Sequence, residues 1–170
     1  MHFRGDLMGD FLVRVYYEDT DCGGIVYHTN YIKYCERARS EIFFSAGAMP
    51  NTQSVGLVVR KLNAEFLDSA KLGDLLVVKT QILKLGGSSL TLLQEIYHAP
   101  DSSLRGVANA EAIQRNKMDC HESANADSRN DNVAPKLIFS CEVKLACIDI
   151  KRKKIVKIPS EILAILQSKF

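Results

Sequence analysis

The sequence is short of two features that would assign it to a large class of proteins, a strong net charge and a long apolar run. Its 22 lysines and arginines nearly balance its 20 aspartates and glutamates, which leaves a formal net charge of +2. A charge this small predicts neither a nucleic-acid-binding protein nor one that binds an anionic membrane. No stretch approaches the about 18 consecutive apolar residues of a membrane-spanning helix, and Met1–Asp10 lacks the apolar run of a signal peptide. We therefore expect a cytoplasmic protein with no membrane span.

The sequence also lacks the cysteine and histidine spacings of disulfide-rich and zinc-binding proteins. Its five cysteines are odd in number and form no Cys-x-x-Cys pair, which argues against a disulfide framework or a zinc knuckle. Its four histidines have no cysteine or carboxylate partner at ligand spacing, so we expect no metal site. Cys22 lies directly beside Asp21, and that carboxylate opposes formation of the thiolate that a nucleophilic cysteine needs.

The length and composition are those of one globular domain. A chain of 170 residues with 46% apolar content can bury one hydrophobic core but is too short for two. The stretch around residues 100–135 differs from the rest, because its second half, His121–Ala134, contains few apolar side chains. Such a segment gains too little from burial to offset the entropy of ordering. We therefore expect a single domain over residues 1–170, with a polar insertion around 100–135.

Hydrophobic periodicity predicts five strands and two helices. Alternating apolar residues predict strands over Phe11–Tyr17, Gly56–Leu67, Asp74–Leu85, Ser88–His98 and Lys136–Ile150. Apolar residues at helical spacing predict a long helix that begins at Asn30, as its cap, and stops at Gly47 and Pro50. A short helix is predicted over Ser160–Ser168, after a proline that suits a helix start.

The most informative stretch is Tyr16–Tyr31. Two aspartates, Asp19 and Asp21, stand at the end of the first predicted strand, and the pair Gly23-Gly24 separates them from the long helix. The first amides of a helix have no partner within the helix and carry partial positive charge. A carboxylate, a glycine turn and a helix N-terminus together place an acid or a nucleophile beside backbone donors. This order of residues predicts acid or nucleophile chemistry in the loop.

The whole string resembles a motif of the hotdog-fold acyl-CoA thioesterases. It is similar in particular to the Tol–Pal-associated (YbgC-type) branch, which is related to 4-hydroxybenzoyl-CoA thioesterase. The residues that carry the resemblance are Tyr17, Glu18, Asp19, Thr20, Asp21, Gly24, Ile25, Val26, Tyr27 and His28, with Glu36, Arg37, Ala38 and Arg39 on the helix. The resemblance covers about Phe11–Tyr97 and Leu137–Phe170. It implies an α+β hotdog fold, in which a curved antiparallel sheet of about five strands wraps one long central helix.

The resemblance also implies the activity of an acyl-CoA thioesterase, which cleaves acyl-CoA to the free acid and coenzyme A. Asp21 would be the nucleophile or general base, and the backbone N–H of His28 would stabilise the oxyanion. The candidate substrate-binding residues are Gly24, Val26, Tyr27, Tyr31, Val59, Arg60, Lys61, Ser88 and Ser89. Coenzyme A is part of the substrate, so no cofactor is expected. The family implies a homodimer or homotetramer and leaves acyl carrier protein open as a further partner.

The sequence leaves a second role open for several residues and a second function open for the protein. The turn that contains Ser88 and Ser89 is rich in amides and follows Lys84, which suits a CoA phosphate, but the same residues also suit a plain hairpin. Asp19 is expected to be a turn residue or an ion-pair partner, and Glu18 to pair with an arginine of the Glu36–Arg39 stretch. A hotdog dehydratase and a non-catalytic adaptor for acyl-CoA or acyl carrier protein are the competing functions. The Asp-Thr-Asp string argues against the first, and the retained Asp21 and Gly24 argue against the second.

Overall fold

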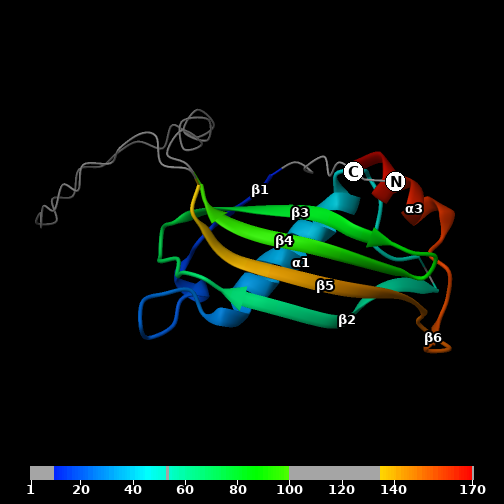
Figure 1. Ribbon diagram of the computed structural model, residues 1–170, viewed down its shortest axis with the longest axis horizontal. Helices are drawn as coiled ribbons and strands as arrows, with labels where there is room; N and C mark the ends of the chain where they lie inside the picture. The colour runs from blue at the N-terminus through cyan, green and yellow to red at the C-terminus, as the bar shows by residue number, and fades with distance from the viewer. Residues whose placement is uncertain (1–9, 53, 100–134, 170) are drawn as a thin grey trace, which may run out of the picture.

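The computed structural model describes residues 10–52, 54–99 and 135–169, and Figure 1 shows their arrangement. The predicted polar insertion around residues 100–135 lies almost entirely outside the described residues. It therefore stays a prediction, together with the single domain over residues 1–170.

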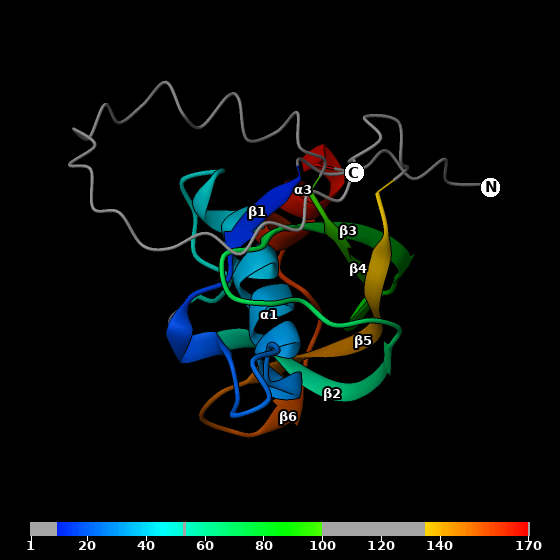
Figure 2. The ribbon, with the colours of Figure 1, turned by 90° about the vertical axis from the view of Figure 1, so that its left-hand side faces the viewer.

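The strands of the described chain form one antiparallel sheet. Its order is β1-β3-β4-β5-β2, and β6 pairs with β5. The strands are Phe11–Arg14 (β1), Val55–Phe66 (β2), Leu75–Leu85 (β3), Ser89–His98 (β4), Leu137–Asp149 (β5) and Lys154–Ile155 (β6). The sheet curls around the long helix α1 (His28–Phe44), as Figure 2 shows. The expected hotdog fold is thus confirmed, with the two-residue β6 as a strand that the sequence did not predict.

The helix α1 and the strand β5 supply much of the core. Residues of α1 that recur at three- and four-residue spacing are buried, which places them on one side of the helix: Tyr31, Tyr34, Cys35, Ala38 and Ile42. Alternate residues of β5 from Phe139 to Cys147 are buried as well. Both periodicities were predicted from the sequence, and burial of these apolar faces is the main stabilising contribution to the fold.

One polar link crosses this core between the helix and the sheet. Gln94 on β4, which is fully buried at 0% exposure, accepts a hydrogen bond from Arg39 Nη1 at 2.6 Å. Its Nε2 donates to the backbone oxygen of Cys35 at 2.9 Å and to Thr80 Oγ1 at 3.0 Å. The amide therefore has partners on both sides, as a buried polar group requires. Burial lowers the pKa of the Arg39 guanidinium.

The first strand ends three residues earlier than the predicted Phe11–Tyr17. It stops at Arg14, because Asp19 ties the following residues into a turn. The N–H of Tyr16 donates to Asp19 Oδ2 at 3.0 Å, and the N–H of Asp19 donates to the Tyr16 oxygen at 3.0 Å. The chain thereby enters the short 3-10 helix η1 (Tyr17–Asp19), and Tyr17 is 82% exposed rather than on the inner face of a strand. Asp19 is a turn residue, as expected.

The predicted start of the long helix is also wrong. Tyr27 is the N-cap residue of α1 and His28 its first residue, so Asn30 lies inside the first turn. Its side chain does not cap the helix but donates to the backbone oxygen of Asp19 at 2.8 Å. The helix ends at Phe44, before Gly47 as predicted.

The structure also tests the predicted last helix and the predicted ion pair of Glu18. The short helix α3 (Ser160–Lys169) is present as predicted. The predicted ion pair of Glu18 is not found within the described residues, where Glu18 is exposed and Arg39 turns inward to Gln94.

Candidate active site

A tight turn holds the carboxylate of Asp21 at the surface. The N–H of Asp21 donates to the oxygen of Ile25 at 2.9 Å, and the N–H of Gly24 donates to the oxygen of Asp21 at 3.0 Å. The N–H of Gly23 donates to Asp21 Oδ1 at 2.8 Å. Gly24 has a φ of +75°, which a glycine adopts without strain. One carboxylate oxygen is thus fixed, and no hydrogen bond of the other is found in the described part of the chain.

The first two residues of α1, His28 and Thr29, place their backbone N–H groups beside this turn. The N–H of Tyr27 donates to the oxygen of Asp19 at 2.8 Å, and the N–H of Asn30 donates to the oxygen of Tyr27 at 2.8 Å. The N–H groups of His28 and Thr29 have no backbone acceptor among residues 10–52, 54–99 and 135–169. Free amides at a helix N-terminus favour negative charge, because the peptide dipoles add along the helix.

A cavity of about 410 Å³ opens between this segment and the end of β2. Five of the predicted site residues contribute to its wall: Asp21, Val26, Tyr27, His28 and Tyr31. Ile25 of the same segment also lines the cavity, and the opposite wall, which the sequence did not predict, consists of Phe66, Leu67, Asp68 and Ser69. The cavity therefore combines a carboxylate, a helix N-terminus and an apolar lining.

Aromatic rings pack against one another at the wall of the cavity. Tyr31 stacks on the buried Phe139 with ring centroids 5.4 Å apart, and Phe66 lies 5.9 Å from Tyr31 and 5.1 Å from Phe139. The ring of His28 meets Phe66 edge-on at 6.3 Å. Offset and edge-to-face contacts of this kind stabilise a fixed arrangement of the rings. The predicted substrate residue Tyr31 thus also helps to hold the cavity wall together.

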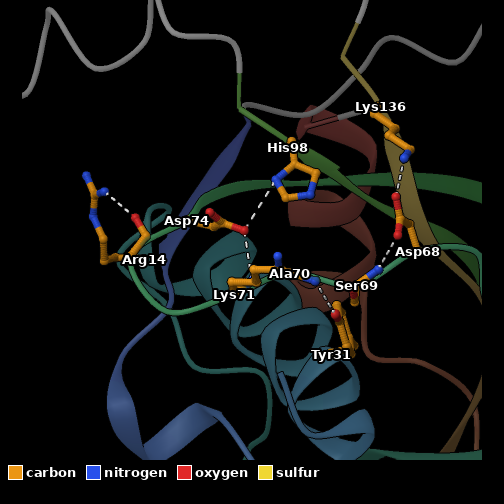
Figure 3. A network of polar contacts seen from close by, with 10 residues as sticks. Arg14, Tyr31, Asp68, Ser69, Ala70, Lys71, Asp74, His98 and Lys136 are labelled. Carbon is orange, nitrogen blue, oxygen red and sulfur yellow. Dashed lines mark hydrogen bonds and ion pairs between the residues drawn. The ribbon is translucent and has the colours of Figure 1, made fainter. Parts of the chain in front are cut away.

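Polar contacts fix the loop that carries the opposite wall (Figure 3). The Ala70 N–H donates to the Tyr31 hydroxyl at 2.9 Å, as Figure 3 shows. The Ala70 oxygen accepts the N–H of Val26 at 2.8 Å. Burial raises the pKa of the Tyr31 hydroxyl, which therefore stays protonated at neutral pH. These two bonds attach the loop after β2 to the segment that contains Val26 and Tyr31, although the two are far apart in the sequence.

Charged side chains secure the two ends of the same loop (Figure 3). Asp68 pairs with Lys136 and accepts the Ser69 N–H at 2.8 Å, and both interactions lower the pKa of its carboxyl. At the other end Asp74 accepts the N–H of Lys71 at 2.8 Å, and its Oδ2 lies 3.7 Å from His98 Nδ1. Asp68 therefore places a negative charge at the rim of the cavity.

Of the other predicted residues, Gly24 lies in the turn beside Asp21, and the remaining five lie elsewhere in this chain. Val59 and Phe66 pair with Leu145 and Phe139 on β5, so along β2 they are roughly 23 Å apart at about 3.3 Å per residue. Val59 is 51% exposed, and Arg60 and Lys61 are exposed beside it. Ser89 pairs with Ala146, next to Leu145, so the Ser88–Ser89 turn also lies at this distant end of the sheet. Within one chain the structure does not bring these five residues to the cavity of Asp21.

The described residues also bear on the metal and membrane expectations. No group of three or more His, Cys, Asp or Glu side chains there could hold a metal ion. Among the same residues, no helix has the length and apolarity needed to cross a membrane.

Comparisons with known proteins find one matching family model, related sequences and similar structures. Residues 23–104 match the family described as "Thioesterase superfamily". The acyl-CoA thioesterase YbgC of Helicobacter pylori is 50% identical over 91 residues, which are 54% of this chain and 68% of the relative. The acyl-CoA thioesterase YbgC of Haemophilus influenzae is 30% identical over 158 residues, which are 91% of this chain and 90% of the relative. A crystal structure of a probable thioesterase from Bartonella henselae superimposes with a TM-score of 0.61 at 26% identity, over 91% of this chain and 100% of that one.

Proposed function

Because this chain belongs to the thioesterase superfamily and is an acyl-CoA thioesterase, we propose that Asp21 and the first turn of α1 form its catalytic centre. The observation that supports this proposal is the cavity whose wall contains both Asp21 and His28. Gly23 holds one oxygen of the Asp21 carboxylate, which leaves the other oxygen for the reaction. The N–H of His28 is the donor to the thioester oxygen, where negative charge develops in the transition state.

Two routes use these same groups. In the first, an oxygen of Asp21 attacks the thioester carbon, the C–S bond breaks, and the CoA thiolate leaves and takes up a proton. Water then hydrolyses the anhydride that has formed between Asp21 and the acyl group. In the second, Asp21 accepts a proton from water, the water oxygen attacks the thioester carbon, and the proton passes to the departing CoA sulfur. Single-turnover hydrolysis in ¹⁸O-labelled water distinguishes them, because only the first route can transfer an Asp21 oxygen to the acid product.

The substrate contacts divide into two groups. Val26, Tyr27 and Tyr31 line the cavity and would contact the acyl end of the thioester. Gly24 lets the backbone approach the reacting group closely, because it has no side chain. Val59–Lys61 and the Ser88–Ser89 turn are assigned to the CoA portion, which extends away from the reacting carbon.

A homodimer would bring β2 of two copies together. β2 lies at one end of the strand order, so its outer edge has no strand partner within the described chain. An exposed edge of 12 residues invites pairing with a second strand. Antiparallel pairing about the middle of β2 would place Val59–Lys61 of both copies at the interface. Sedimentation that shows an active monomer would contradict this arrangement, and a homotetramer would add a second interface.

The cofactor, the acyl donor and the location of the protein are also part of the proposal. Hydrolysis is proposed to need no cofactor, since coenzyme A belongs to the substrate. Acyl carrier protein stays a candidate donor of acyl groups, and a cytoplasmic location stays a prediction from the sequence. The family assignment favours hydrolysis over the dehydratase and adaptor alternatives.

The test is the hydrolysis of a series of acyl-CoA esters, followed with a free-thiol reagent. Asp21→Asn should lower kcat by roughly 10²-fold or more, because it removes the nucleophile or base. Glu161→Gln is the matched control: it makes the same carboxyl-to-amide change at an exposed residue of α3 outside the cavity wall. An Asp21→Asn protein with the kcat of the control would refute the assignment.

A further inference from the structure

Two buried oxygen atoms behind the catalytic turn have no hydrogen-bond partner in the described chain. They are Asp19 Oδ1 and the hydroxyl of Tyr34, on residues that are 2% and 0% exposed. Buried polar atoms are nearly always paired. Burial is the largest cause that raises the pKa of Tyr34, and the neighbouring Asp19 carboxylate adds to it through its charge and through its contact with the hydroxyl. A protonated hydroxyl therefore stands beside a carboxylate oxygen that lacks a donor.

The other atoms of Asp19 bind the residues on both sides of His28. The backbone oxygen of Asp19 accepts the N–H of Tyr27 at 2.8 Å and the side-chain Nδ2 of Asn30 at 2.8 Å. Asn30 is 6% exposed, so its side chain has little access to water as an alternative partner. Asp19 Oδ2 accepts the N–H of Tyr16 at 3.0 Å, which fixes the carboxylate itself.

These bonds determine the direction of the His28 N–H. The N–H of His28 belongs to the same peptide group as the oxygen of Tyr27, and a peptide group is planar and trans. The Tyr27 oxygen accepts the N–H of Asn30 at 2.8 Å, so it is held towards the helix. The N–H of His28 must then point the opposite way. Anchoring Asn30 through Asp19 therefore anchors the proposed oxyanion donor.

We propose that Asp19, Asn30 and Tyr34 form a buried positioning network that orients the backbone N–H of His28 for catalysis. This inference rests on the function proposed above, since it assigns the residues that position its oxyanion donor. The network acts through geometry and not through the charge of Asp19. Its three members are positioning residues, because none of them lines the cavity.

Substitutions separate geometry from charge. Asn30→Ala removes the donor to Asp19, and Asp19→Ala removes the acceptor of the Tyr16 N–H. Each should lower kcat at least tenfold and change KM less than about threefold, because a small misplacement of a catalytic group has a large effect on rate. Asp19→Asn keeps an oxygen acceptor and adds a donor for the Tyr34 oxygen, so its kcat should stay within about threefold of wild type. An Asp19→Asn protein as slow as Asp19→Ala would overturn the proposal.

Thr80→Val is the matched control for a loss of stability alone. It removes the buried hydroxyl that accepts a hydrogen bond from Gln94 at 3.0 Å, on β3 and outside the cavity wall. It should lower the Tm much as Asn30→Ala does but leave kcat unchanged. If both variants lose activity equally, destabilisation explains the effect and the network does not. Should Asn30→Ala fail to fold, Tyr34→Phe replaces it: a kcat at least threefold below wild type is expected, and an unchanged kcat would overturn the proposal.

A second measurement is independent of turnover. The backbone ¹⁵N order parameter of His28 should lie near the rigid value of about 0.85 in the wild type and fall towards about 0.6 in Asn30→Ala. Thr80→Val should leave it unchanged, and an unchanged value in Asn30→Ala would contradict the network. If the wild type fails to hydrolyse acyl-CoA, the proposed function fails, while the order parameter still tests the network.

Discussion

Two glycine-to-alanine substitutions should have opposite effects. Gly23→Ala should lower activity but not the Tm, and Gly47→Ala should lower the Tm but not activity. A Cβ atom at Gly23 would lie 3.1 Å from Asp21 Oδ1, closer than ordinary contact. The carboxylate would have to shift by a few tenths of an ångström or leave its bond to the Gly23 N–H. A Cβ atom at Gly47 would meet nothing within 4 Å, but Gly47 has a φ of +68°. Gly23→Ala should therefore disturb the catalytic group, and Gly47→Ala only the backbone.

The size of both effects follows from the general cost of misplacing a catalytic group and of a left-handed side chain. A 1 Å misplacement of a catalytic group costs about 10²-fold in rate, so a smaller shift at Asp21 should lower kcat by roughly three- to tenfold. Gly23 has no left-handed φ, and a compatible glycine-to-alanine change stabilises by about 0.4–1 kcal/mol, so the Tm should not fall. Gly47→Ala places a side chain in the left-handed region at a cost of about 1–2 kcal/mol. For a chain of this size the Tm should fall by roughly 2–8 °C.

The assay compares both variants with the wild type by thermal unfolding and by acyl-CoA hydrolysis at a temperature where all three are folded. Gly23→Ala is expected to be slow with an unchanged or higher Tm, and Gly47→Ala to be fully active with a lower Tm. The reasoning fails if Gly23→Ala keeps the wild-type kcat, because the Asp21 carboxylate would then not need its observed position. It also fails if Gly47→Ala loses activity, since Gly47 lies beyond the far end of α1 from the cavity.

Three further outcomes are expected. Tyr31→Phe leaves a buried backbone N–H without its acceptor, so urea denaturation should show a loss of about 1–3 kcal/mol in the free energy of unfolding. Among the described cysteines only Cys22 should react rapidly with a thiol reagent, as mapped by mass spectrometry, because it is exposed whereas burial raises the pKa of Cys35 to about 12. Lys136 lowers the pKa of Asp68 in the folded protein. The pair therefore stabilises the fold fully above about pH 3.9, which is the pKa of an aspartate in the unfolded chain. This stabilisation is lost as the pH falls through the lower pKa of the folded state. Lys136→Met should make the Tm less dependent on pH in the acid range, and an equal dependence would contradict the ion pair.

Much of the fold could be predicted because it depends on short-range pattern. In β5 the alternate residues from Phe139 to Cys147 are buried, and a period of two allows only a strand with one face inward. The ends of the elements could not be predicted in the same way. Asn30 has the residue type of a helix cap, but its side chain binds Asp19, 11 positions earlier in the chain. That partner is available only after the turn at η1 has formed, so residue type alone points to the wrong role.

The candidate site was predictable where it is contiguous in sequence. Asp21 and His28 share one turn and one helix start, so local structure is enough to bring them together. Phe66 and Ser69 reach the same cavity only because β2 pairs with β5 and the Ala70 backbone binds Val26 and Tyr31. No local pattern near residue 66 signals these contacts.

The two aspartates of the motif show how environment separates identical side chains. Asp19 and Asp21 stand on either side of Thr20, whose hydroxyl donates to the oxygen of Tyr17 at 3.0 Å. Asp19 is buried and binds backbone groups, while Asp21 is exposed at the cavity with one oxygen held by Gly23. A buried carboxylate that accepts backbone N–H groups is suited to hold geometry, and an accessible one beside free amides is suited to chemistry. The carboxyl-to-amide change should therefore be tolerated at Asp19 and not at Asp21, although the two positions are equivalent by residue type.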